Sequence, residues 1–214
     1  MNFDVWTISA LVDELHSRVV GGRVQDVLDL NEYAIGLEIY ANRERHYLVL
    51  DASPQQPHIH LVPDKLRRGL PRPTQLGLLL RRYVEGGALV DVTQPPWERM
   101  LILHIESASG VSEIVVEAIE RRANILLVQE GLILDCIRRV GPDENRVRVS
   151  LPGHDYVMPP PQRGKIAPGV VTLADVESLL EAGSGGQAWQ ALTPLFRSPS
   201  AVRRSASSML APKR

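Results

Sequence analysis

The feature that most constrains the fold is a succession of short apolar segments, most of which follow one another with no helical segment between them. Short runs rich in β-branched and aliphatic side chains, bounded by turn residues, are typical of β-strands. They cover residues 23–30, 33–41, 46–52, 58–62, 89–93, 100–107, 112–120, 124–129 and 132–140. Parallel strands would need a crossover, usually a helix, after each strand, so this order predicts an antiparallel sheet and an α+β fold.

Three other segments have the apolar spacing of amphipathic helices. They are residues 8–19, 74–85 and 172–183. A Gly-Gly pair follows each of the first two and Gly183 ends the third, and glycine beyond the last turn is a common helix stop. Two proline-rich segments, 63–74 and 151–162, are expected as surface loops, and the first, PDKLRRGLPRPT, is also basic.

Residues that usually carry catalysis or bind metals are sparse. Cys136 is the single cysteine, so it forms no internal disulfide, and its apolar surroundings favour a buried, inert thiol. Neither a glycine-rich phosphate loop nor a nucleophile elbow is present. His58 and His60 project to one face of a predicted strand, but no third ligand has a matching spacing. We therefore expect no cofactor, no metal and no reaction carried by these residues.

The N-terminal segment and the apolar runs bear on location. No run of 18 apolar residues occurs, which argues against a membrane helix. The first residues, MNFDVWTISALVDEL, contain acids and no basic region, so they do not read as a signal peptide. Together with the single cysteine, these features predict a cytosolic protein.

Arginine dominates the basic residues. The chain has 21 arginines against 3 lysines and five Arg-Arg pairs. Arginine is well suited to bidentate phosphate contact and to stacking on bases, so this bias favours a nucleic-acid partner. A genome that uses arginine throughout explains the same composition equally well.

Polar side chains also interrupt otherwise apolar strands. Buried charge is costly unless it is paired or used, so such positions hold either cross-strand salt bridges or a binding site. Both explanations remain open at this point. The residues concerned are Glu98, Arg99, Glu117, Arg121, Arg122 and Asn124.

Five segments, in a fixed order across roughly residues 3 to 196, carry a family resemblance. They read FDVWTISALVDELHSRVVGGRVQDV, LLLRRYVEGGALVDVTQ, ERRANILLV, LPGHDYVMPPPQ and ALTPLFRSPSAV. Together they resemble the NFACT family of ribosome-associated quality control factors, of the RqcH and NEMF type. The resemblance implies an antiparallel β-sandwich flanked by helices, similar to the N-terminal domain of formamidopyrimidine-DNA glycosylases. It assigns residues 1–168 to an NFACT-N domain and 169–214 to an incomplete helix-hairpin-helix region with a frayed tail.

The same resemblance implies a function in binding. Family members bind tRNA and a large ribosomal subunit that still holds peptidyl-tRNA, and they direct template-free tailing of the stalled chain, with alanine in bacteria. The ribosomal peptidyl transferase centre makes the bonds, so the chain itself is expected to be no enzyme. The implied partners are tRNA, alanyl-tRNA in particular, and the obstructed large subunit, with no membrane and no small-molecule substrate.

The resemblance also assigns residues to tRNA binding and tailing. An Asp-Arg pair of the family stands where this chain has Glu98-Arg99, so the acid here is one methylene longer. Glu117 matches a glutamate implicated in reading tRNA, while Glu120 replaces the glycine of the family's Gly-Arg motif. The full expected set is Asp4, Glu98, Arg99, Glu117, Arg121, Arg122 and Asn124.

Two rival functions deserve comparison. Names used in this family include fibronectin-binding protein A, so a fibronectin- or fibrinogen-binding adhesin is the alternative, although no signal peptide or anchor is evident. A DNA-repair glycosylase would need an N-terminal proline nucleophile, and here Met1 precedes Asn2 and Phe3. Because no coiled coil follows, we expect an N-terminal portion of a longer family member, without tailing activity of its own.

Overall fold

Most of the chain folds into strands, with two helices beside them. The computed structural model describes residues 4–96, 98–160, 172, 174 and 177, and within these it has two α-helices, α1 (Val5–Arg18) and α2 (Gln75–Tyr83). A 3-10 turn, η1, covers Glu120–Arg122. The strands are β1 (Arg23–Asn31), β2 (Ala34–Ala41), β3 (Glu44–Asp51), β4 (His58–Val62), β5 (Ala88–Thr93), β6 (Met100–Ser107), β7 (Gly110–Glu117), β8 (Asn124–Gln129) and β9 (Leu132–Cys136).

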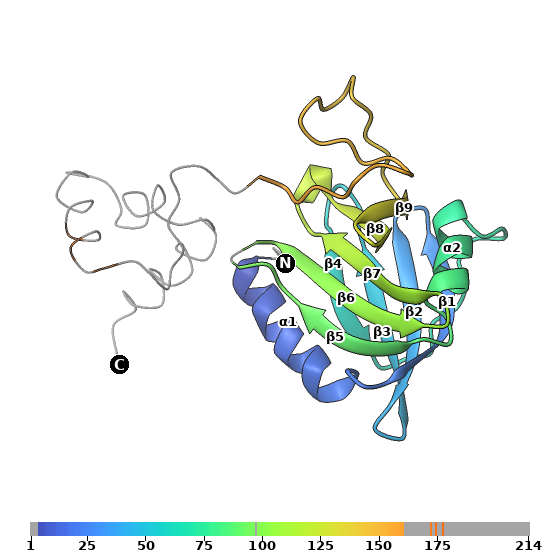
Figure 1. The fold of residues 1–214 in the computed structure, drawn as a ribbon. Helices are drawn as coiled ribbons and strands as arrows, with labels where there is room; N and C mark the ends of the chain where they lie inside the picture. Colours follow the sequence, from blue (N-terminus) through green and yellow to red (C-terminus); the bar gives the residue numbers. More distant parts are fainter. Residues whose placement is uncertain (1–3, 97, 161–171, 173, 175–176, 178–214) are drawn as a thin grey trace.

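Backbone pairing joins these strands into one antiparallel sheet. Its order is β4-β3-β2-β1-β5-β6-β7-β8-β9, so β4 and β9 form the two edges of an open sheet (Figure 1). Only one pair of Cα partners, Arg23 and Ala88, joins β1 to β5, which divides the sheet into an arm of β1–β4 and an arm of β5–β9. The predicted α+β class is confirmed. The strands form one sheet, whereas a β-sandwich has two. The expected similarity to the glycosylase domain stays a prediction.

Both arms contribute side chains to one core. Because alternate residues of a strand point to opposite faces, each strand gives every second side chain to this core. Leu37 of β2 and Leu103 of β6 lie in the same buried cluster, and the helices add Leu15 and Leu80. At about 1.5–3 kcal/mol for each fully buried aliphatic side chain, this cluster is the main stabilising element of the fold.

A smaller cluster covers the other face of β6–β9. It is built from Met100, Val115, Leu126, Val128, Ile133 and Cys136, with Ile102 and Tyr156 packed against it. The segment 151–156 runs along β9, where Ile133 N donates to His154 O at 2.9 Å and Tyr156 N donates to Gly131 O at 2.7 Å. The described part of the predicted 151–162 loop therefore wraps the sheet surface, as expected.

The predicted helices over 8–19 and 74–85 are confirmed, with starts set by side-chain caps. Asp4 accepts from Thr7 N at 2.9 Å, and Thr74 Oγ1 accepts from Gly77 N at 2.9 Å. Such caps satisfy backbone N–H groups that the first turn leaves without partners. The helix predicted over 172–183 and the boundary at 168 lie outside the described residues, apart from 172, 174 and 177.

The two Gly-Gly pairs lie where a helix meets the joint between the arms. Gly21 and Gly86 have φ of +82° and +80°, a conformation that glycine adopts without the penalty of a side chain. Across the joint, Gly21 N donates to Leu89 O and Leu89 N donates to Gly22 O, each at 2.8 Å. The glycines thus end the helices, as predicted, and also join the two arms.

Helix length sets a limit on membrane insertion. Neither of the α-helices within the described residues is long and apolar enough to cross a bilayer, which takes about 20 residues.

Candidate nucleic-acid interface

Antiparallel pairing gathers the ends of three strands at one end of the sheet. Glu117, the last residue of β7, pairs with Met100 at the start of β6 and with Asn124 at the start of β8. Just beyond, Ala118 N donates to Arg99 O at 2.9 Å. The entry to β6 and the exit from β7, far apart in the sequence, are therefore neighbours.

The turn before β6 links this end of the sheet to α1. Gln94 Nε2 donates to Glu98 O at 2.9 Å and to Val5 O at 3.0 Å, in the first turn of α1. Asp4, which caps that turn, lies on the same side. The end of the sheet thus collects all the residues expected from the resemblance, namely Asp4, Glu98, Arg99, Glu117, Arg121, Arg122 and Asn124.

Glu98 and Arg99 lie in a turn fixed by its backbone. Glu98 N donates to Pro95 O at 3.0 Å, and the carbonyl groups of both residues accept the bonds from Gln94 and Ala118. Both side chains are half-buried. The backbone contacts hold the pair at the start of β6, where an arginine side chain can reach a ligand bound at this end of the sheet.

Glu117 is buried and its carboxylate is paired inside the protein. Its side chain is about 1% exposed, Arg148 Nη1 donates to Oε2 at 2.9 Å, and Arg148 Nη2 donates to Oε1. Tyr156 O–H donates to Oε1 at 3.0 Å, and the guanidinium lies 5.5 Å from the Tyr156 ring centroid. A two-pronged pair with a further hydrogen bond compensates a buried charge well. The sequence left two explanations open for Glu117, a cross-strand salt bridge or a binding site. The structure shows a salt bridge, but its partner, Arg148, lies outside the strands.

The pKa values of the two partners reflect this environment. Burial and then the Glu117 carboxylate raise the pKa of Tyr156, so its hydroxyl remains protonated and donates. Burial alone would lower the pKa of Arg148, but the hydrogen bond and charge of Glu117 raise it overall. Sequence reasoning missed Arg148 and Tyr156 as partners, although Tyr156 stands in the quoted LPGHDYVMPPPQ segment.

Asn124 and Arg138 fix the 3-10 turn η1. The buried Asn124 side chain donates through Nδ2 to Arg138 O at 2.9 Å and accepts from Arg138 N at 2.8 Å. The Arg138 guanidinium donates to Arg121 O at 2.5 Å and pairs with Glu144. The amide of Asn124 is therefore used by the backbone, and it positions η1 instead of facing solvent.

Arg121 and Arg122 present the accessible charge of this region. Both are exposed, and neither forms an ion pair with another residue in the described part of the chain. Their backbone is held, since Arg138 binds Arg121 O and Arg122 N donates to Ile119 O at 2.9 Å. Two adjacent guanidinium groups on a fixed turn suit contact with phosphate.

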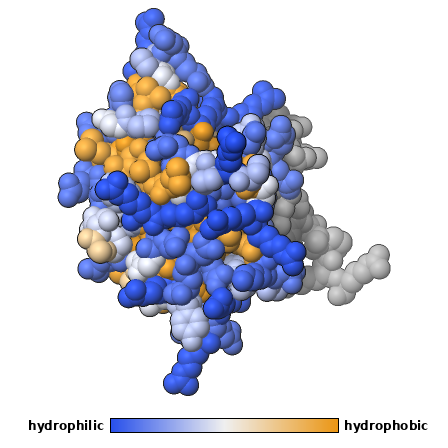
Figure 2. Space-filling view, turned by 90° about the vertical axis from the view of Figure 1, so that its right-hand side faces the viewer, coloured by the Kyte–Doolittle hydropathy of each residue, from blue (hydrophilic) through white to orange (hydrophobic). Residues whose placement is uncertain are grey.

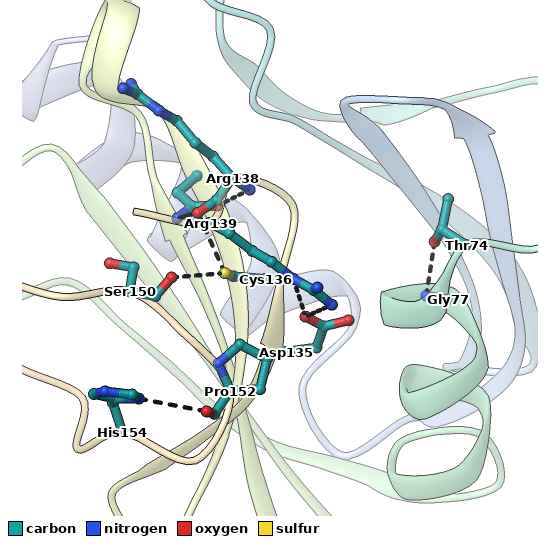
Figure 3. A network of polar contacts seen from close by, with 10 residues as sticks. Thr74, Gly77, Asp135, Cys136, Arg138, Arg139, Ser150, Pro152 and His154 are labelled. Carbon is teal, nitrogen blue, oxygen red and sulfur yellow. Dashed lines mark hydrogen bonds and ion pairs between the residues drawn. The ribbon is translucent and has the colours of Figure 1, made fainter. Parts of the chain in front are cut away.

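Cys136 lies behind this region as a buried thiol. Its Sγ donates to Arg138 O at 3.2 Å and to Ser150 O at 3.4 Å, and Asp135 and Arg139 form an ion pair beside it (Figure 3). Burial and then the charge of Asp135 raise the pKa of Cys136 to about 12. A thiol with such a pKa is a poor nucleophile and metal ligand, which confirms the expected buried role.

His58 and His60 do lie together on β4. Their ring centroids are 5.0 Å apart, and burial followed by the neighbouring His58 lowers the pKa of His60. Within the described residues, no three side chains of the His, Cys, Asp or Glu type gather closely enough to hold a metal ion.

The family model of the NFACT N-terminal and middle domains matches residues 4–205, nearly the whole chain. The chain belongs to the NFACT family. This NFACT chain is 29% identical over 175 residues to the Rqc2 homolog RqcH of Bacillus subtilis (strain 168), a match that covers 78% of this chain and 30% of the relative. The Rqc2 homolog RqcH of Streptococcus pneumoniae serotype 2 is 29% identical over 167 residues, which are 75% of this chain and 30% of the relative.

Solved structures share the fold of this NFACT chain. The N-terminal domain of the fibronectin-binding protein PavA from Streptococcus pneumoniae superposes with a TM-score of 0.83 at 25% identity, over 98% of this chain and 80% of that one. The N-terminal part of the fibronectin/fibrinogen-binding protein FBPS from Streptococcus suis gives 0.81 at 25% identity, with the same coverage. The chain spans about 30% of the length of the curated relatives above. The family resemblance read from the sequence is therefore confirmed.

Proposed function

We propose that this chain binds tRNA, alanyl-tRNA in particular, at the end of the sheet around Arg99, Arg121 and Arg122. The supporting observation is the pair of exposed arginines on η1. The backbone of η1 is fixed by Arg138 and Asn124, and η1 follows β7, the strand that pairs with β6. A rigid backbone lowers the entropy lost when long side chains engage a ligand. Membership of a family that includes Rqc2 homologs supports an RNA partner.

The seven residues divide into two groups in this proposal. The guanidinium groups of Arg99, Arg121 and Arg122 contact phosphate, and Glu98 orients its neighbour Arg99. Glu117, Asn124 and Asp4 act through the framework, because each is at least 97% buried and bonded within the protein. Their substitution would therefore change binding by moving the arginines.

The proposed role in the cell is to support template-free alanine tailing of stalled chains. In this role the module holds a charged tRNA beside a large ribosomal subunit that still carries peptidyl-tRNA. The ribosomal peptidyl transferase centre forms the bonds, so the module acts in the cytoplasm as a binding protein, without a cofactor and without contact to a membrane.

Binding of fluorescently labelled tRNA across a salt series tests the proposal. The logarithm of the binding constant falls with the logarithm of salt concentration by roughly 0.7–0.9 for each phosphate contact. The Arg121→Ala/Arg122→Ala variant should weaken binding and reduce that slope by about 1.5. A matched control, Arg18→Ala/Arg43→Ala, removes two exposed arginines elsewhere. Equal effects of the two double variants, or no tRNA binding by the wild-type chain, would overturn the proposal.

The structural relatives named for fibronectin and fibrinogen binding support a second candidate, binding of such proteins. Immobilised fibronectin presented to the wild-type chain and to the Arg121→Ala/Arg122→Ala variant separates the two. Tight binding that resists salt and is equal for both proteins would favour this second function. Absence of binding at micromolar protein concentrations would remove it.

A further inference from the structure

The loop of residues 63–74 carries a second concentration of positive charge, far along the chain from η1. Lys65, Arg67, Arg68 and Arg72 are all exposed. Arg68 approaches Asp26 at 3.6 Å, while the other three form no ion pair with any described residue. The proposed tRNA site uses none of these residues. We call this segment the basic loop.

The backbone of the basic loop is fastened to β1. Gly69 N donates to Asp29 O at 3.0 Å, and Leu70 N approaches the same carbonyl at 3.4 Å. A Cβ atom on Gly69 would lie 1.8 Å from Leu30 O, so the two backbones touch at a point that accepts no side chain. Leu66 packs inward, since a Cβ atom on Gly36 would lie 2.7 Å from Leu66 Cδ1.

A buried carboxylate fixes the end of the loop and the start of α2. Asp29 is 1% exposed and accepts from Thr74 N at 3.1 Å, from Thr74 Oγ1 at 2.5 Å and from Arg81 Nη2 at 2.5 Å. A Cβ atom on Gly77 would lie 2.2 Å from Asp29 Oδ1, so α2 rests directly on this carboxylate. The charge of Arg81 is thus used inside the protein, and the charges of the loop are left for solvent.

The basic loop lies away from the end of the sheet described above. Hydrogen bonds near Arg23 join β1 to the start of β5, and from there β1 leads toward Asp29 while β5 leads toward Gln94. In Figure 1, α2 and the loop before it lie to the right of the sheet, and α1 lies to its left. Figure 2 faces the α2 side and shows hydrophilic side chains over most of it, with apolar patches between them.

We infer that the basic loop is a second phosphate-binding surface, which contacts the backbone of structured RNA. The inference rests on the proposed function only in taking RNA as the partner. Exposed arginines on a fixed backbone match the planar, two-pronged geometry of phosphate contact. The leucines of the loop are half-buried, and prolines stand between its cations, so the loop lacks the aromatic anchors typical of protein interfaces. With η1, it gives the chain two separate contacts to one large RNA.

The first test compares charge removal at two places. A labelled RNA hairpin is titrated across a salt series with the wild-type chain and with Lys65→Ala/Arg67→Ala/Arg72→Ala. We expect the slope of log binding constant against log salt to fall by about 2 in the triple variant. A smaller slope in this variant than in the charge-matched control below supports the inference, and an unchanged slope overturns it.

The control variant removes three exposed arginines outside both surfaces, Arg18→Ala/Arg23→Ala/Arg43→Ala. It changes the net charge by the same amount, so general electrostatic attraction falls equally in both triple variants. Equal slopes for the two would show that only the overall charge matters, and this would overturn the inference. Circular dichroism melting confirms that each variant is folded before binding is measured.

A second variant moves the basic loop without changing any charge. Gly69→Ala forces the loop away from Leu30 O, whereas Gly141→Ala adds a methyl group with no atom within 4 Å. We expect Gly69→Ala to weaken RNA binding severalfold and to lower the salt slope, and Gly141→Ala to match the wild type. If Gly69→Ala binds RNA as the wild type does, fixed placement of the cations is irrelevant and the inference fails.

The outcomes separate this inference from the proposed function. If the Arg121→Ala/Arg122→Ala variant loses binding and the loop variants do not, the inference fails and the proposed function stands. If only the loop variants lose binding, the basic loop is the RNA surface and the proposed site at η1 fails. Competition by polyglutamate at the same charge concentration as RNA would assign the loop to acidic proteins, and so overturn the inference.

Discussion

Two buried carboxylates, one in each arm of the sheet, make a close comparison. Asp29 near the end of β1 binds Arg81 of α2, and Glu117 at the end of β7 binds Arg148 from a segment without regular structure. Both acids are about 1% exposed. Each binds a side chain of an irregular segment, or of its end, and both segments contain exposed arginines, such as Arg67 in one arm and Arg146 in the other.

The two carboxylates differ in what remains when the arginine is removed. Asp29 also accepts two hydrogen bonds from Thr74, whose position is set by the start of α2. Glu117 also accepts one from Tyr156, which belongs to the same irregular region as Arg148. Loss of the arginine should therefore lower stability more at Glu117 than at Asp29, because Tyr156, the second donor to Glu117, lies in the same irregular segment as Arg148.

The largest effect is expected for Arg148→Ala. This change leaves Glu117 buried without a countercharge, which costs about 3–5 kcal/mol of the free energy of unfolding. Urea denaturation followed by circular dichroism measures the loss. Arg148→Lys keeps the charge without the two-pronged contact and should lose less. A loss below about 1 kcal/mol for Arg148→Ala would mean that hydration or protonation of Glu117 replaces the ion pair, and it would contradict a stabilising role for that pair.

A smaller effect is expected for Arg81→Ala. Thr74 continues to donate twice to Asp29, so the cost should be about 2–3 kcal/mol, in the range of hydrogen bonds to charged groups. The double variant Arg81→Ala/Arg148→Ala sharpens the comparison, since independent sites give losses that add within about 0.5 kcal/mol. A loss for Arg81→Ala that exceeds the loss for Arg148→Ala would reverse the ranking drawn from the donors.

The smallest effect concerns the pH dependence contributed by Cys136. Burial raises the pKa of this thiol to about 12 in the folded state, from its ordinary value of 9.0. Its contribution to stability is therefore complete below pH 9 and is lost as the pH rises from 9 toward 12. At pH 10 the loss amounts to about 1.4 kcal/mol, and Cys136→Ala should remove it. In the native chain a thiol reagent at pH 8 should react slowly; fast reaction would contradict the burial.

Much of the fold could be predicted because the signals are local. Apolar runs and turn residues placed the strands, and glycine pairs placed the helix ends. The single sheet could not be predicted, because it depends on the pairing of Arg23 with Ala88 and the hydrogen bonds beside it, which join segments 65 positions apart. Similarly, an acid on an apolar strand was readable at Glu117, but Arg148 as its partner was not, since no local pattern links them.

The expected residues were found together at one end of the sheet, but the contacts that each side chain makes were not predictable. The resemblance selected the residues, and antiparallel pairing then brought them to one end of the sheet. Burial separates the residues bonded within the protein from the exposed ones, and it depends partly on the segment 138–158, whose Arg148 and Arg138 bind Glu117 and Asn124. Asp29 was missed, although it has the same signal as Glu117, an acid between the apolar residues Leu28 and Leu30.

The joint at the two Gly-Gly pairs has a consequence for the architecture as a whole. Val24 stands three residues after Gly21, and Leu89 stands three residues after Gly86. Gly21 N donates to Leu89 O and Gly86 N donates to Val24 O, so the same hydrogen bond is formed in both directions between the arms. The segments Val-x-Gly-Gly-x-[Val/Leu]-x-Asp-Val, at 19–27 and 84–92, repeat in sequence as well.

Such reciprocity is the property of a two-fold symmetric dimer interface, here formed within one chain. Each arm is a unit of one helix followed by a meander of strands, and both units shift register after the corresponding residue, Val24 and Leu89. The molecule is thus an approximate internal duplicate. The two buried carboxylates lie outside the repeated segments, so the symmetry belongs to the scaffold, and the surfaces proposed for RNA binding lie where the two arms differ.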